Sequence, residues 1–141
     1  MGEPVLDVDG LPLAVAAVIA RGDGRFLLIR RGPAVPAPGY WTPVTGRLEA
    51  GETFAEAVVR EAREEVGLDV TAGAEVARTL TADGRYRLVW LAALPRDGSA
   101  PLALAPDEVA EARWLTAAEA CALEPMFPAT RAFFESRSRP A

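Results

Sequence analysis

Three glutamates that could bind a metal ion lie close together near the middle of the chain. Glu61, Glu64 and Glu65 fall in the segment FAEAVVREAREEV, residues 54–66. In a helix, spacings of three and four residues bring side chains together within one turn. Like charges at these spacings destabilise a helix by roughly 0.2–0.5 kcal/mol per pair. The C-terminal half of a helix also disfavours anions. Such a face therefore needs cations from elsewhere.

Arginine neutralises only part of this acidic face. Arg60 stands four residues from both Glu56 and Glu64 and can pair with either. Glu61 and Glu65 have no basic neighbour on their own face of the helix. A hard divalent cation favours carboxylate oxygens as ligands. A solvated acidic surface is the alternative, and for such a face considered alone it is the commoner outcome.

The helix that carries these glutamates has a start and a stop signal. Thr53 and Glu56 have the spacing of a capping box, and Gly67 stands where a left-handed C-terminal residue is expected. The sequence therefore predicts a helix over residues 54–66. The stripe predicted to face the core consists of Ala55, Val59, Ala62 and Val66, and the glutamates fall on a different face.

The rest of the chain alternates strand-like runs with a few helices. Residues 13–20 and 25–30 are apolar runs around a turn at 21–24, which predicts a hairpin. The remaining expected elements are a loop at 32–39, a short strand at 40–44, a loop at 45–51, strands at 75–80, 86–94 and 112–115, a short helix opening at Thr116, and a helix from Pro128 to about Ser136. Without regular βαβ alternation, this order predicts an α/β fold in which helices flank a mixed sheet.

Composition excludes several kinds of chemistry. All 15 basic residues are arginine, and there is no histidine and no lysine. Mechanisms with an imidazole base, such as Ser-His-Asp and Cys-His arrangements, are therefore excluded. The lack of lysine excludes a Walker A phosphate loop and a Schiff base. Carboxylates, with or without a metal ion, remain for acid–base chemistry.

Length and charge limit the partners. The 141 residues fit one domain, taken as 1–141. A net charge of −5 argues against a nucleic acid polymer or an anionic membrane as the main partner. The single cysteine, Cys121, excludes an intrachain disulfide, and residues 1–10 contain no basic residue of the kind that opens a signal peptide. We therefore expect a cytoplasmic protein.

The three glutamates belong to a longer motif that spans residues 46–68. Residues 46–68 read GRLEAGETFAEAVVREAREEVGL. This segment resembles the Nudix box, whose defining positions correspond here to Gly46, Glu52, Arg60, Glu61, Glu64, Glu65 and Gly67. Ala62 replaces a larger apolar residue, and Thr45 stands where many members have a second glycine. The resemblance implies an α/β/α sandwich around a central mixed sheet.

The resemblance also implies an activity. Nudix hydrolases cleave the diphosphate bond of a nucleoside diphosphate linked to another group, by attack of water on phosphorus. They depend on Mg²⁺, for which Mn²⁺ is a possible substitute. By resemblance the metal ligands are Glu61, Glu64 and Glu65, with a backbone carbonyl of Thr45 or Gly46. The helical pattern ranks Glu61 and Glu65 above Glu64.

Supporting roles follow from the same resemblance. Arg60 is expected to orient the site through a salt bridge to Glu64 or Glu52, and Glu52 to support the loop before the helix. The general base stays open between Glu64, Glu108 and Glu111. For Glu108 and Glu111, plain surface charge is an equal alternative.

Other side chains are candidates for substrate contact. Guanidinium groups match phosphate geometry, which makes Arg47, Arg30 and Arg31 candidates, although for each one considered alone a solvated charge is the commoner outcome. Trp41 could stack on a base, as could Tyr40 and Trp90, but aromatic residues beside strands usually belong to the core. Cys121 is interpreted as core.

The substrate is not fixed by the sequence. Nucleoside triphosphates, nucleotide sugars, ADP-ribose and dinucleoside polyphosphates are all candidates. The segment from Trp41 to Gly46 resembles dihydroneopterin triphosphate pyrophosphatases. The alternative from another class is a non-catalytic Nudix-like nucleotide sensor, against which the intact box argues. A homodimer is also compatible with the resemblance.

Overall fold

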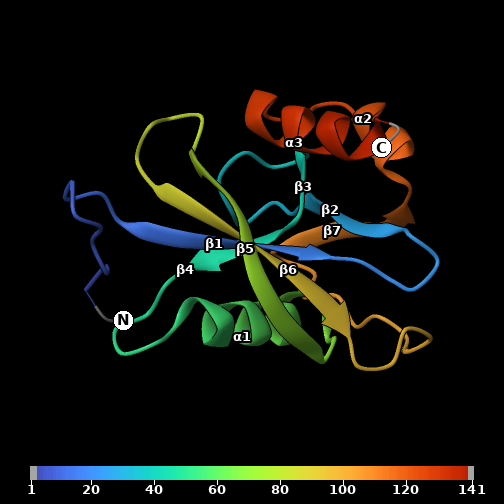
Figure 1. Ribbon diagram of the computed structural model, residues 1–141, viewed down its shortest axis with the longest axis horizontal. Coiled ribbons are helices and arrows are strands. Elements are labelled where there is room, and N and C mark those ends of the chain that lie inside the picture. The colour runs from blue at the N-terminus through green and yellow to red at the C-terminus, as the bar shows by residue number, and fades with distance from the viewer. Residues whose placement is uncertain (1–2, 140–141) are drawn as a thin grey trace.

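A computed structural model describes residues 3–139 as three layers. Helix α1 (Phe54–Val66) covers one side of the strands, and helices α2 (Ala117–Cys121) and α3 (Pro128–Ser138) cover the other (Figure 1). This is the α/β/α arrangement that the sequence predicts. The outermost residues of the expected domain, 1–2 and 140–141, lie outside the described part. Within residues 3–139, no helix is long and apolar enough to cross a membrane.

The strands form two sheets instead of the single sheet expected. Their bounds are β1 Leu13–Ile19, β2 Phe26–Arg31, β3 Trp41–Thr42, β4 Val44–Arg47, β5 Val70–Leu80, β6 Arg87–Pro95 and β7 Val109–Leu115. One sheet has the order β4-β1-β6-β5 and the other β3-β2-β7. The pair β1–β6 is parallel and all other pairs are antiparallel, so the larger sheet is mixed.

The hairpin predicted for residues 13–30 forms only at its turn. The Arg21 amide donates to the Arg25 carbonyl at 2.8 Å, and a single bridge joins Ala20 to Phe26. Beyond it, β1 and β2 separate into different sheets. The reason is that β4 and β6 already occupy both edges of β1, which leaves β2 no edge to pair with.

Several strand boundaries were wrong. Residues 45–47, expected to begin a loop, belong to β4, which pairs with β1 and places Gly46 opposite Val15. Pro43 separates β3 from β4 because it has no amide hydrogen to donate to a ladder. Strands β5 and β7 begin earlier than predicted, at Val70 and Val109. In β5, two bulges break the alternation that identifies a strand in sequence.

Helix α1 has the predicted bounds and both predicted caps, but not the predicted core face. Its capping box joins Thr53 and Glu56, and Gly67 adopts the left-handed conformation with φ 66°. Ala55 is exposed, whereas Val58 is fully buried. The buried face consists of Ala57, Val58, Glu61, Ala62, Glu65 and Val66. The prediction omitted Ala57 and Val58. Because both are buried, the buried face of the helix is wider than predicted and includes Glu61 and Glu65.

Candidate active site

A pair of buried carboxylates lies on α1. Glu61 is 8% exposed and Glu65 6% exposed, although both are charged residue types. Burial is the main cause that raises the pKa of each above its usual range. The neighbouring carboxylates of Glu61 and Glu108 raise the pKa of Glu65 further, while Arg31 opposes the shift. Two acids in this position favour a bound cation or a shared proton.

The backbone of β4 lies directly against this pair. A Cβ atom on Gly46 would stand 2.0 Å from Cδ and 2.2 Å from Oε1 of Glu61. Position 46 therefore requires glycine because a side chain there would clash with Glu61. Backbone conformation is not the reason, since the φ of Gly46 is not in the left-handed region. The close approach brings the β4 backbone beside the Glu61 carboxylate, and both supply the oxygen ligands that Mg²⁺ prefers.

Arg60 joins the loop before α1 to the acidic pair. Its Nε donates to Glu52 Oε2 at 2.7 Å and its Nη2 to Glu52 Oε1 at 2.9 Å, which is the fork-to-fork geometry. Its Nη1 donates to Glu61 Oε1 at 2.6 Å. The expectation that Glu61 lacks a basic neighbour was therefore wrong, because the long Arg60 side chain reaches round the helix. Glu65 has no such bond within the described residues.

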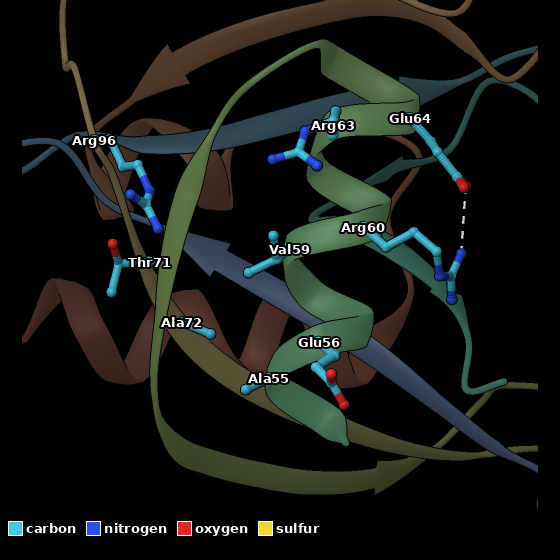
Figure 2. Close-up of a pocket in the computed structure, with 9 residues that line it drawn as sticks. All are labelled: Ala55, Glu56, Val59, Arg60, Arg63, Glu64, Thr71, Ala72 and Arg96. Atoms are coloured by element: carbon cyan, nitrogen blue, oxygen red, sulfur yellow. Dashed lines mark hydrogen bonds and ion pairs between the residues drawn. The ribbon is translucent and has the colours of Figure 1, made fainter. Parts of the chain in front are cut away.

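Glu64 lies at the exposed side of the pair, and its charge contributes to the raised pKa of Glu61. Its Oε2 lies 3.3 Å from Arg60 Nη1, and its side chain is 56% exposed. It belongs to the wall of an open groove between α1 and β5, and the two buried glutamates are not among the residues that line this groove (Figure 2). Over residues 3–139, no three acidic, histidine or cysteine side chains converge as a metal site. The three carboxylates therefore do not meet at one point in the described residues, and the role of Glu64 as a metal ligand stays a prediction. The two buried carboxylates still fit a divalent cation whose other ligands are backbone, water or phosphate oxygens.

The candidate substrate residues divide between the two faces of the smaller sheet. Arg30 lies opposite both Trp41 and Glu111 in the sheet register. This row shares the face of Leu28, which packs in the cluster beneath α2 and α3. Arg31 follows Ile29, whose face packs against α1, and its charge acts on Glu65. Of Arg30, Arg31 and Trp41, Arg31 is the one on the side of the acidic pair, and Arg47 belongs to β4 of the larger sheet.

The other members of the row contact one another. Glu111 accepts from Arg113 at 2.5 Å and lies 3.5 Å from Arg30. Trp41 is 4% exposed, and the Arg113 guanidinium lies 4.8 Å from its ring centre. Arg47 is exposed, and only its carbonyl is used, as an acceptor for Arg60 at 2.9 Å. The core interpretation of Trp90 is confirmed, since it is 1% exposed.

One contact that sequence reasoning missed involves Thr45. Its hydroxyl accepts from Arg31 Nη1 at 3.2 Å. The departure from glycine at this position was visible in the sequence, but its partner was not, because the two residues belong to strands of different sheets.

Arg60→Gln should destabilise the protein by about 2–4 kcal/mol, because it leaves Glu52 and Glu61 without their partner in a mostly buried position. Urea unfolding measures the free energy. Arg63→Gln is the control: its pair with Asp69 is solvent-exposed on both sides, so about 0–1 kcal/mol is expected. Equal losses in the two variants would contradict a special role of the Arg60 network.

Comparison with known proteins agrees with this geometry. A family model described as NUDIX domain matches residues 10–136. The crystal structure of a MutT protein from Methanosarcina mazei Go1 has a TM-score of 0.74 and 26% identity to this chain. The match covers 90% of this chain and 92% of that one.

Curated relatives carry different names. A CTP pyrophosphohydrolase of Escherichia coli (strain K12) is 43% identical over 63 residues, 45% of this chain and 46% of the relative. An NAD-capped RNA hydrolase, NudC of Deinococcus radiodurans, is 34% identical over 128 residues, and the match covers 84% of this chain and 42% of the relative. A dihydroneopterin triphosphate diphosphatase of Escherichia coli (strain K12) is 40% identical over 62 residues, and the match covers 43% of this chain and 39% of the relative. The chain spans less than half the length of each of these relatives.

Proposed function

Because the chain belongs to the Nudix domain family, we propose that it hydrolyses the diphosphate bond of a nucleoside diphosphate joined to another group. The observation that carries the proposal is the buried pair Glu61 and Glu65, packed against the β4 backbone at Gly46. Burial of two adjacent carboxylates opposes folding unless a cation or a shared proton offsets their charge, and a divalent cation does so where substrate must also bind.

The metal in this proposal is Mg²⁺, with Mn²⁺ as a substitute. Glu61 and Glu65 hold it, together with the Gly46 carbonyl and oxygens of the substrate. When bound, such an ion offsets the charge of the diphosphate and acidifies the attacking water. Arg60 fixes the Glu61 carboxylate, and Glu52 fixes Arg60. Glu64 pairs with Arg60 on the exposed side and its charge acts on Glu61, so it stays the third candidate ligand.

For the general base we favour Glu108, since its charge acts on Glu65. Glu111 belongs to the opposite face of the sheet and pairs with Arg113. Glu108→Gln should lower kcat by about 10²-fold, as for loss of a general base, and Glu111→Gln by less than about threefold. Steady-state kinetics with saturating Mg²⁺ distinguishes the two. A larger loss for Glu111→Gln would reverse the assignment.

Arg31 is the side chain we propose for contact with the substrate phosphates, because it lies beside the acidic pair. Which group the diphosphate carries is a separate question, since the curated relatives act on different compounds by name. The segment from Trp41 to Gly46 favours a pterin triphosphate, and the CTP pyrophosphohydrolase match favours a nucleoside triphosphate. A cytoplasmic location, with its reducing environment, suits the single cysteine.

The test is phosphate release, with coupling enzymes, from a panel of nucleoside triphosphates, nucleotide sugars, ADP-ribose, dinucleoside polyphosphates and dihydroneopterin triphosphate. Turnover of at least one compound in Mg²⁺, abolished by a chelator and restored by Mg²⁺ or Mn²⁺, is expected. Binding of nucleotides with no turnover across the panel would favour the alternative of a nucleotide sensor.

A further inference from the structure

The Arg31 guanidinium is held from two sides. Its Nε donates to the Pro36 carbonyl at 2.5 Å, and its Nη1 donates to the Thr45 hydroxyl at 3.2 Å. Pro36 lies in the loop between β2 and β3, and Thr45 lies in β4. Three segments that are separate in the fold therefore meet at one side chain.

The backbone of Arg31 closes the same loop. Its amide donates to the Tyr40 carbonyl at 2.8 Å, and its carbonyl accepts from Gly39 at 2.8 Å. Loop residues 32–39 thus return to the residue where they began. Both the main chain and the side chain of Arg31 are fixed by this loop, so the direction of the side chain depends on it.

The loop also contacts the segment that precedes β7. Gly32 donates to the Glu108 carbonyl at 2.7 Å, and Ala34 to the Asp107 carbonyl at 2.9 Å. A Cβ atom on Gly32 would stand 2.6 Å from the Asp107 carbonyl oxygen, so only glycine fits here. This packing keeps Arg31 and Glu108 in neighbouring segments.

From this position the charge of Arg31 acts on Glu65 and opposes the rise of its pKa. The sheet register shifts between Arg30 and Arg31, and such a bulge changes the direction of a side chain. Burial lowers the pKa of Arg31, and the charge of Glu65 opposes that shift. An arginine side chain has several rotatable bonds and loses rotamer freedom when it is fixed. Hydrogen bonds at Nε and Nη1 supply that restraint before any ligand binds.

We infer that Thr45 is a positioning residue: its hydroxyl, together with the Pro36 carbonyl, holds the Arg31 guanidinium turned toward Glu65, where it meets the diphosphate. The contact between Arg31 and the diphosphate rests on the proposed function, whereas the restraint of Arg31 by Thr45 does not. Valine has the shape of threonine without the acceptor, and serine keeps the acceptor without the methyl group.

Kinetics with three variants test the inference. Thr45→Val should raise the KM for the diphosphate substrate about tenfold and change kcat less than about twofold, since the lost bond positions a binding group. Thr45→Ser should restore the KM to within about twofold of the wild type. Thr71→Val, an exposed β5 threonine remote from Arg31, is the matched control and should leave both constants unchanged. Equal losses for Thr45→Val and Thr45→Ser would overturn the role of the hydroxyl.

A second measurement needs no turnover. In the substrate-free protein, NMR line shapes of the arginine side chains report rotation of the Arg31 guanidinium about its Nε–Cζ bond. Rotation should be about tenfold faster in Thr45→Val than in the wild type or in Thr45→Ser. Unchanged rotation in Thr45→Val would overturn the inference whatever the panel shows. Faster rotation without hydrolysis would instead count against the proposed function alone.

Discussion

Glu65→Gln lowers kcat/KM in Mg²⁺ by on the order of 10³-fold, if several kcal/mol of transition-state stabilisation come from a metal ion held by this carboxylate. Glu65 is 6% exposed and has no arginine hydrogen-bonded to it within the described residues, so a metal ion is the partner expected to offset its charge. The amide keeps the shape of the side chain but removes the charge. The measurement is steady-state kinetics at several Mg²⁺ concentrations.

The control for this variant is Glu75→Gln. Glu75 lies on β5, is exposed and pairs, within residues 3–139, with Arg78 alone, so its loss should leave kinetics within about twofold. In a chelator, Glu65→Gln should also melt a few degrees higher than the wild type, because a neutral amide replaces a buried carboxyl group whose ionisation opposes folding. A variant that is both inactive and less stable would indicate a structural role for Glu65 instead.

Gly46→Ala should lower kcat between about 10²- and 10³-fold, because it displaces a catalytic group by more than an ångström. The added Cβ would lie 2.0 Å from Cδ of Glu61, so the carboxylate must leave its present position. The same displacement breaks the 2.6 Å bond from Arg60 to Glu61. Kinetics at saturating Mg²⁺ and thermal unfolding together measure the effect.

The matched control is Gly22→Ala. Gly22 lies in the turn after β1, its φ is not in the left-handed region, and a Cβ there meets nothing within 4 Å. Activity and stability should remain within about twofold and 0.5 kcal/mol of the wild type. If Gly46→Ala were as active as this control, the close approach of β4 to Glu61 would have no catalytic importance.

The local parts of the fold were predictable from sequence, and the long-range parts were not. Helix α1 has both of its predicted ends, since a capping box and a C-terminal glycine are signals read within a few residues. The hairpin predicted for residues 13–30 was too long. The strands that pair with β1 instead lie at 44–47 and 87–95, far from it in the sequence. No local pattern indicates that both edges of a strand are taken.

The candidate site shows the same division. The spacing of Glu61 and Glu65 placed them together and ranked them above Glu64, and the structure buries the two and leaves Glu64 exposed. Sequence could not separate Arg31 from Arg30, or Glu108 from Glu111. Which side of the sheet each one faces depends on cross-strand register and on a bulge between β2 and β7.

The central claim is that Glu61 and Glu65 hold a divalent cation. Anomalous diffraction from crystals grown with Mn²⁺ locates that ion directly. We expect a peak bounded by these two carboxylates and the β4 backbone at Gly46, absent in crystals of Glu65→Gln. A peak elsewhere, or one that persists unchanged in the variant, would contradict the account.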